Sequence, residues 1–248
     1  MAEEVWVDAE PFSFEGGKTG VLVVHGFTGC TQSMLPLGEG LAAAGFTVMG
    51  PRLPGHGTSV QDLRPRQWEE WTGEAEKSLQ ELLGRCDKVF VTGLSMGGTI
   101  TCFLGERYAG KVAGLIPINA AVAKLNPMLP LTPIAKYVLK TIPGVGSDIK
   151  DPNSKESAYD KVPVPAAAEL YGLMKATKAE IAKITDPILI FSSREDHVVS
   201  TKNGPFILER VSSTDRELVW LENSYHVATI DNDKQLIIDR CVEFINKH

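Results

Sequence analysis

The sequence lacks the features that would place it across a membrane or on nucleic acid. No apolar run approaches the roughly 18–20 residues that a membrane-spanning helix requires. Lysine and arginine total 25 against 31 aspartate and glutamate residues, which gives a formal charge of −6. Proteins that bind nucleic-acid backbones carry a basic patch or stripe, so we expect no nucleic-acid partner and no stable insertion into a membrane.

Cysteine is scarce, and a secretory leader is not apparent. The first ten residues are acidic where such a leader is positively charged, and they hold no apolar segment. Cys30, Cys86, Cys102 and Cys241 form no C-x-x-C pair and show no metal-ligand spacing with histidine. We therefore expect a cytoplasmic protein with reduced thiols and no metal.

Short apolar runs alternate with longer helical patterns over most of the chain. Because the runs are apolar throughout, they are typical of strands that are covered on both faces of a parallel sheet. The order predicts an α/β fold, with a mostly parallel central sheet and helices on both faces. The expected strands are residues 20–25, 46–49, 88–92, 112–118, 187–191 and 217–221, and helical spacing marks 68–83 and 234–247, the latter with Asp231 or Asp233 as N-cap.

Residues 121–184 interrupt this alternation. No strand-like run occurs there, seven of the 15 prolines fall within it, and helical pieces are predicted at 133–141 and 166–184. Such an insertion predicts a small helical cap, or lid, over a site. The alternative is a helical subregion of the core. We assign residues 1–120 and 185–248 to the core and 121–184 to the cap.

A candidate nucleophile follows the expected strand at 88–92. Gly93-Leu-Ser95-Met-Gly97 matches the G-x-S-x-G pattern, and residues 98–107 are typical of a helix. In a tight strand–turn–helix junction the serine hydroxyl projects above the sheet, and small neighbours let strand and helix approach. The pattern therefore predicts Ser95 as nucleophile; the alternative is a glycine-rich turn with an ordinary serine.

A serine hydroxyl is a weak nucleophile and needs a base. In a doubly wound sheet the reacting groups gather beyond the carboxyl ends of the strands. His226 follows the run at 217–221 in such a loop and is the predicted base, with His197 as the second candidate.

The base in turn needs an acid that orients the imidazole and stabilises its charged form. Asp196 lies five residues past the run at 187–191 and is the predicted acid. Glu195 is its adjacent rival.

Acyl transfer also requires hydrogen-bond donors aimed at the oxyanion of the tetrahedral intermediate. The backbone N–H of Met96, next to the nucleophile, is the first candidate. The loop His25-Gly-Phe27-Thr-Gly29 follows a strand, and the N–H of Phe27 is the second. The alternative is that these glycines form only a turn, with the histidine as packing.

These motifs together resemble the α/β-hydrolase superfamily, in which the triad has the same order, Ser95, Asp196, His226. Within it they are most similar to bacterial monoacylglycerol lipases and thermophile carboxylesterases. The resemblance rests on His25-Gly-Phe-Thr-Gly29, Pro54-Gly-His-Gly57, Gly93-Leu-Ser-Met-Gly-Gly98, Asp196-His-Val-Val199 and Ser224-Tyr-His226.

The resemblance implies cofactor-free hydrolysis of carboxylic esters through an acyl-enzyme intermediate. The expected substrates are small molecules, monoacylglycerols or other short-to-medium-chain acyl esters. The family forms its cap by an insertion after the sixth strand, where residues 121–184 fall, and holds the acyl chain in an apolar pocket beneath it. The loop at 25–29 departs from the H-G-G-G of other lipases, which argues against esters of bulky tertiary alcohols.

Similar bacterial lipases have a glutamate at the position of Glu156. The resemblance implies that Glu156 accepts a hydrogen bond from a glycerol hydroxyl. The alternative is a solvated loop carboxylate, because Asp148, Lys150, Asp151 and Lys155 surround it in the sequence like an ordinary surface.

Two further functions stay open. An acyltransferase, or a hydrolase of C–C or peptide bonds, would use the same triad, because the pocket and not the triad sets the substrate. A non-enzymatic binding module on this scaffold is expected to lack a triad member, whereas all three are present here in order.

Overall fold

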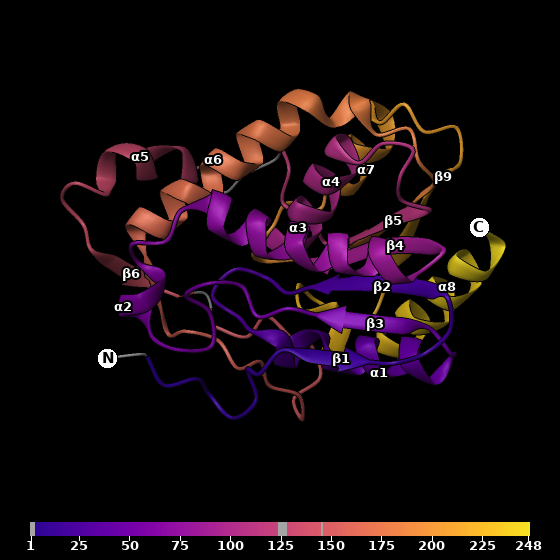
Figure 1. Cartoon of the computed structure of the whole chain (residues 1–248). Coiled ribbons are helices and arrows are strands. Elements are labelled where there is room, and N and C mark those ends of the chain that lie inside the picture. Colours follow the sequence, from indigo (N-terminus) through magenta and orange to yellow (C-terminus); the bar gives the residue numbers. More distant parts are fainter. Residues whose placement is uncertain (1–2, 124–127, 145) are drawn as a thin grey trace.

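A seven-stranded sheet forms the centre of this computed structural model, which describes residues 3–123, 128–144 and 146–248 (Figure 1). The strand order is β1-β3-β2-β4-β5-β8-β9. β1 runs antiparallel to β3, and the other neighbouring pairs are parallel. The strands are β1 (Phe12–Phe14), β2 (Thr19–Val24), β3 (Thr47–Gly50), β4 (Lys88–Leu94), β5 (Gly114–Ile118), β8 (Ile188–Ser193) and β9 (Arg216–Leu221).

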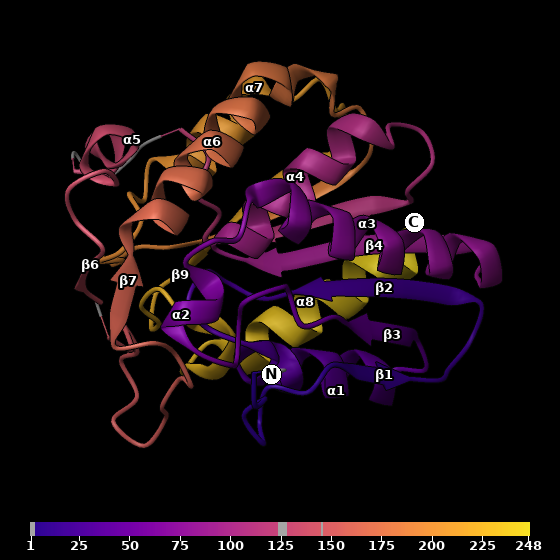
Figure 2. The same cartoon turned by 60° about the vertical axis from the view of Figure 1, so that its left-hand side comes forward.

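Helices cover both faces of this sheet (Figures 1 and 2). Val21 and Val23 belong to a core shared with α1 and α8, whereas Leu22 and Val24 belong to a core shared with α3, α4 and α7. Alternate residues of one strand thus feed opposite cores, which explains why the run is apolar at every position. The helices are α1 (Leu35–Ala43), α2 (Val60–Leu63), α3 (Trp68–Arg85), α4 (Met96–Arg107), α5 (Thr132–Ala135), α6 (Val164–Glu180), α7 (Asn203–Arg210) and α8 (Lys234–Lys247).

The predicted α/β architecture is confirmed, with one strand missed at the sheet edge. The six expected runs correspond to β2, β3, β4, β5, β8 and β9. β1 was missed because it has only three residues, none of them buried. Asp233 occupies the N-cap position of α8 but makes no capping bond there, because its carboxylate accepts the N–H of Asn223 at 2.8 Å.

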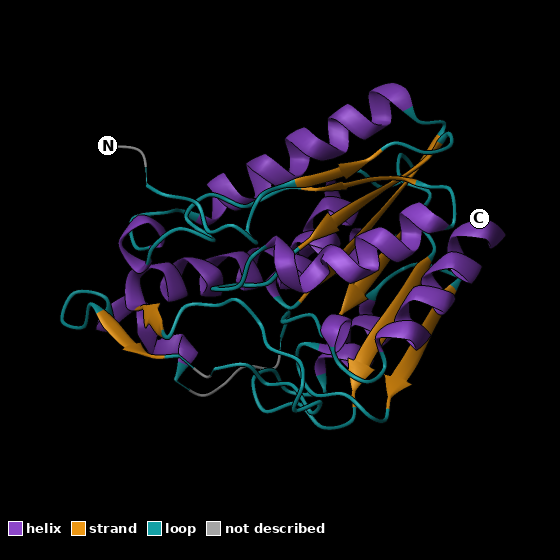
Figure 3. Ribbon diagram, turned by 90° about the horizontal axis from the view of Figure 1, so that it is seen from below, coloured by secondary structure: helices purple, strands orange, loops and turns teal. Residues whose placement is uncertain are grey.

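Between β5 and β8 the chain leaves the sheet. Its α5 and β6 (Thr141–Pro143) lie beyond the end toward which β2 and β3 point, and α6 runs back toward α4 (Figure 1). The expectation of no strand here was wrong. β6 and β7 (Lys161–Pro163) form a separate antiparallel pair, visible apart from the central sheet in Figure 3. Strands of three residues are too short to show a period of two.

One other expectation about this insertion also needs correction. The helix expected at 133–141 is shorter, since α5 ends at Ala135 and Thr141 already belongs to β6. The insertion follows β5, the strand expected at 112–118. The second expected helix is present as α6, extended by a 3₁₀ turn at Ile181–Lys183, and it packs on α4 and α3.

Across the described ranges, no helix is both long and apolar enough to span a bilayer. The four cysteines are free thiols, and three of them, Cys30, Cys102 and Cys241, are buried.

Candidate active site

Ser95 lies in a strained turn between β4 and α4. Its backbone angles are φ 57° and ψ −114°, and a positive φ is unfavourable for a residue with a side chain. The Ser95 N–H donates to the carbonyl of Ile118 at 2.9 Å, which ties the turn to β5. The predicted strand–turn–helix setting is therefore present, and the strain distinguishes Ser95 from an ordinary turn serine.

Glycines on both sides make this turn sterically feasible. A Cβ on Gly97 would lie 2.1 Å from the carbonyl oxygen of Val24, and a Cβ on Gly93 would lie 2.4 Å from the Gly97 backbone. Both distances are far inside van der Waals contact. The turn therefore requires glycine at 93 and 97, because the backbone of α4 contacts the backbones of β2 and β4 directly there.

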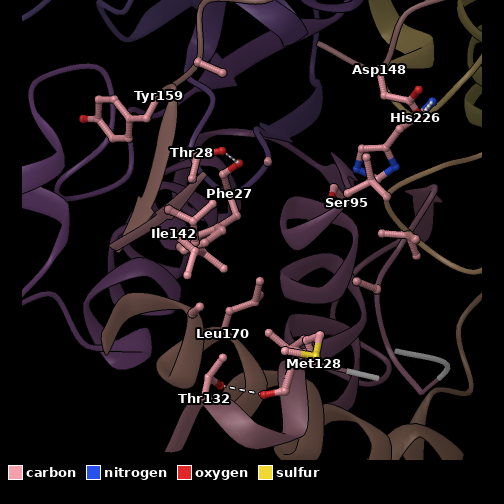
Figure 4. Close-up of a pocket in the computed structure, with 18 of the residues that line it drawn as sticks. Phe27, Thr28, Ser95, Met128, Thr132, Ile142, Asp148, Tyr159, Leu170 and His226 are labelled. Carbon is pink, nitrogen blue, oxygen red and sulfur yellow. Dashed lines mark hydrogen bonds between the residues drawn. The ribbon is translucent and has the colours of Figure 1, made fainter. Parts of the chain in front are cut away.

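His226 and Asp196 form a hydrogen-bonded pair at the same edge of the sheet. His226 Nδ1 lies 2.8 Å from Asp196 Oδ2, and their side chains are only 8% and 3% exposed. The second oxygen of Asp196 accepts the N–H groups of Val198 and Val199, at 2.9 and 2.7 Å. The Nδ1 proton of His226 is thereby directed to Asp196, and Figure 4 shows the imidazole beside Ser95.

The rival candidates point elsewhere. His197 Nδ1 lies 2.7 Å from Asp148 Oδ1, and the His197 side chain is 52% exposed. Glu195 is 54% exposed and approaches His197 Nε2 at 3.5 Å. Neither belongs to the described residues that line the pocket over Ser95. The geometry therefore favours His226 and Asp196.

The environment of His226 favours its charged form. Burial lowers the pKa of His226, but the hydrogen bond and charge of Asp196, with the charges of Glu156 and Asp148, outweigh burial and raise it above its ordinary value. A base surrounded in this way is stabilised as an imidazolium once it has taken a proton.

The two candidate oxyanion donors lie at the loop after β2 and the first turn of α4. Neither the Phe27 N–H nor the Met96 N–H donates a hydrogen bond to another residue in the described part of the chain. The Phe27 ring packs against Trp71 and His56, with centroids 5.7 and 6.0 Å apart. Both N–H groups are thus free to donate to a ligand, and the packing of the Phe27 ring holds its loop in place.

His25 holds the first of these loops in place. Its Nε2 accepts the N–H of Leu53 at 3.0 Å, so the proton is on Nδ1, which donates to the carbonyl of Gly26 at 2.9 Å. Burial lowers the pKa of His25 to about 4. His25 is therefore a neutral histidine that stabilises the loop. A structural histidine here is compatible with Phe27 donating its N–H to an oxyanion.

A cavity of about 360 Å³ opens over Ser95. Ser95 and His226 lie at one end of the residues drawn in Figure 4, with Met128, Thr132 and Leu170 at the other. The walls of the cavity are mostly apolar, as the binding of an acyl chain requires. Much of the apolar lining comes from the insertion: Met128, Leu129, Leu131, Leu139, Ile142, Val162, Val164, Leu170 and Met174.

Glu156 places a carboxyl group in this lining. A Cβ on Gly29 would lie 2.6 Å from Glu156 Oε1, which shows how closely the side chain approaches the loop after β2. Burial raises the pKa of Glu156 to about 7, and the nearby His226 partly offsets this effect. The side chain thus faces the pocket and not the open surface.

Sequence reasoning missed Asp148, which also lines the pocket. It was grouped with the surface charges around Glu156, and no local pattern distinguishes it from them. Within the described ranges, no cluster of three or more histidine, cysteine or acidic side chains could hold a metal ion.

Known proteins resemble this chain over most of its length. The family model described as serine aminopeptidase, S33, matches residues 17–233. A thermostable monoacylglycerol lipase from Bacillus sp. strain H-257 is 46% identical over 243 residues, which cover 97% of this chain and 95% of that protein. The chain belongs to the α/β-hydrolase superfamily. The predicted family is confirmed, and with it the predicted enzyme class, a carboxylic ester hydrolase.

Other relatives of this α/β-hydrolase extend the comparison. A carboxylesterase of Bacillus subtilis strain 168 is 27% identical over 97% of this chain and 98% of that protein. A solved structure from work on the metagenome-derived lipolytic enzymes LipS and LipT is 45% identical, with a TM-score of 0.96 over 99% of this chain and 100% of that one. A monoacylglycerol lipase of Paleococcus ferrophilus shares the fold at 20% identity, with a TM-score of 0.82 over 96% and 98% of the two chains.

The candidate triad should behave as one unit. Ser95→Ala should lower kcat by several orders of magnitude, and adding His226→Ala should cost little more, because either loss disables the same nucleophile. Asp196→Asn should also be severe, since an amide can hold the imidazole in the wrong tautomer. Steady-state kinetics on a p-nitrophenyl ester measure these losses. Glu195→Gln is the matched control; a crippling Glu195→Gln with a mild Asp196→Asn would move the acid to Glu195.

Activity should follow the titration of His226. The base must be neutral to accept the Ser95 proton, so kcat/KM should rise with pH through the His226 pKa and then reach a plateau. That pKa is raised. The midpoint for p-nitrophenyl butyrate should therefore lie above the value of about 6.5 for an unperturbed histidine. A midpoint below that value in a pH–rate profile would contradict the described surroundings of His226.

Proposed function

We propose that this α/β-hydrolase cleaves monoacylglycerols, and other short-to-medium-chain acyl esters, through an acyl-enzyme on Ser95. The observation that carries the proposal is the carboxyl group of Glu156 in a mostly apolar pocket beside the Ser95 turn and the Asp196–His226 pair. The monoacylglycerol lipase activity named for the 46% identical Bacillus relative supports it.

In the proposed mechanism, Ser95 Oγ attacks the ester carbonyl carbon while His226 Nε2 takes the hydroxyl proton. Asp196 holds the Nδ1 proton and stabilises the imidazolium. The N–H groups of Phe27 and Met96 donate to the oxyanion, and His226 then returns its proton to the leaving glycerol oxygen. A water molecule, activated by His226, attacks the acyl-enzyme in the same manner and releases the fatty acid.

The insertion is proposed as the cap of this site, with residues 121–184 as cap and residues 1–120 and 185–248 as core. Support comes from the pocket walls, since Leu129, Ile142, Val162 and Leu170 of the insertion line the same cavity as Ser95 and His226 of the core. Burial of a fatty acyl chain against these side chains gives about 0.8 kcal/mol for each methylene group.

The alcohol side of the ester gives Glu156 its proposed role. A buried carboxylate is costly unless hydrogen-bond donors reach it. A monoacylglycerol has two free hydroxyl groups that can donate, whereas a simple alkyl ester has none. Glu156 would therefore favour glycerol as the leaving group.

The family description names an aminopeptidase, and a carboxylate such as Glu156 also suits an α-ammonium group. Hydrolysis of an amino-acid p-nitroanilide in preference to a monoacylglycerol would favour that activity. Transfer of the acyl group to an added alcohol, without net hydrolysis, would favour an acyltransferase.

We further propose a cytoplasmic location, where thiols stay reduced. The free cysteines support it, because disulfides are common in oxidising compartments.

Loss of the Glu156 carboxylate should discriminate between substrates. Glu156→Ala should remove an interaction of about 1.5–3 kcal/mol, the range of a hydrogen bond to a charged group. That is a loss of about 10–150-fold in kcat/KM for a monoacylglycerol. The p-nitrophenyl ester of the same acid is the matched control and should change little. Equal losses on both substrates would mean that Glu156 supports the cap, and no loss on either would remove it from the site.

The preference for glycerol esters should depend on pH. Since burial raises the pKa of Glu156 to about 7, the ionised acceptor is present above that pH and disappears below it. The ratio of kcat/KM for the monoacylglycerol to kcat/KM for the p-nitrophenyl ester cancels the titration of His226. This ratio should rise with pH through about 7 in the wild type and stay flat in Glu156→Gln. A flat ratio in the wild type would argue against recognition by the ionised carboxylate.

A further inference from the structure

Asp148, a carboxylate outside the triad, connects the two loops that carry the acid and the base. It belongs to the insertion between β5 and β8, its side chain is 10% exposed, and it lines the pocket. Figure 4 shows it beside His226.

The contacts of Asp148 reach both loops. Its Oδ2 accepts the backbone N–H of His197 at 3.0 Å and the backbone N–H of His226 at 3.2 Å. Its Oδ1 lies 2.7 Å from the His197 Nδ1. Its carbonyl oxygen accepts the N–H of Val227 at 3.1 Å. One residue of the insertion thus binds the residue after Asp196 and the backbone of the base itself.

This bridge matters because the acid and the base come from separate loops. Asp196 is fixed by N–H groups of its own loop, those of Val198 and Val199. The length of its 2.8 Å bond to His226 therefore depends on how the loop after β8 sits relative to the loop after β9. A carboxylate that accepts N–H groups from both loops sets that separation.

We propose that Asp148 is a positioning residue for the Asp196–His226 pair, and that it also acts on the base through its negative charge. Asp148 touches the backbone of His226, while its charge adds to those of Asp196 and Glu156 around the imidazole. The proposal rests on the proposed role of His226 as base.

A neighbouring carboxylate keeps Asp148 in place. Asp231 is 1% exposed and accepts the N–H groups of Lys150, Asp151 and Tyr225 at 2.8, 3.0 and 2.9 Å. These bonds attach the segment that follows Asp148 to the loop that carries His226. The substrate-facing insertion and the catalytic loops are therefore joined at one junction.

Two substitutions separate the positional contribution from that of the charge. An asparagine at 148 can accept both backbone N–H groups with its amide oxygen, as Oδ2 does, and donate its amide N–H to neutral His197 Nδ1. Asp148→Asn therefore keeps the bridge but removes the charge. Asp148→Ala removes both.

The experiment compares pH–rate profiles of these variants on p-nitrophenyl butyrate. Asp148→Ala should lower the plateau kcat by about 10–100-fold with little change in KM, since a misplaced catalytic group costs up to about 10²-fold. Asp148→Asn should restore most of the plateau kcat. Its acidic limb should move to lower pH, because the imidazolium of His226 loses one stabilising charge while Asp196 and Glu156 remain.

His197→Ala is the matched control, since it removes the ring from Asp148 but keeps both backbone N–H groups. It should keep near wild-type kcat. A wild-type plateau in Asp148→Ala would overturn the proposal. A second result would also overturn it: Asp148→Ala and Asp148→Asn lose equal amounts of kcat, their acidic limbs do not shift, and their melting temperatures fall equally. That result would mean that Asp148 contributes only to packing. Activity in Ser95→Ala, measured alongside, would instead overturn the proposed function.

Discussion

The close approach of α4 to β2 behind Ser95 is the constraint on which the site depends. Gly97 meets the carbonyl of Val24 so closely that no side chain fits between them. This contact forces the positive φ of Ser95 and lifts its hydroxyl above the carboxyl edge of the sheet. The loops after β2, β8 and β9 begin at the same edge because these strands are parallel, and they carry the candidate residues Phe27, Asp196 and His226.

Three carboxylates surround His226, and their different settings suit them to different tasks. Asp196 accepts hydrogen bonds from the backbone N–H groups of Val198 and Val199 and lies 2.8 Å from the imidazole. Asp148 bonds to the backbone of the loops, and Glu156 faces the cavity with its pKa raised by burial to about 7. His226 therefore has carboxylates both on the side of the loops and on the side of the cavity.

The insertion both lines the cavity and is bonded to the loop that carries His226. Its apolar residues wall the cavity, while Asp148 and the segment held by Asp231 are bonded to the loop of His226. The part of the wall near Met128 and Leu170 lies at the far end of the residues drawn in Figure 4, away from this junction.

The sequence by itself determined a mostly parallel sheet, the positions of its main strands along the chain and the motifs that contain Ser95, Asp196 and His226. These features are local, because apolar periodicity and the G-x-S-x-G pattern each depend on residues that are close together in the sequence. Only the tertiary structure decided the three-residue strands β1, β6 and β7, which pair through distant backbone. It also decided that Asp233 bonds Asn223 instead of capping α8, and that Asp148 and Glu156 line the pocket. Charged neighbours in the sequence mark Asp148 as a surface residue, whereas the fold brings it backbone N–H donors from loops far along the chain.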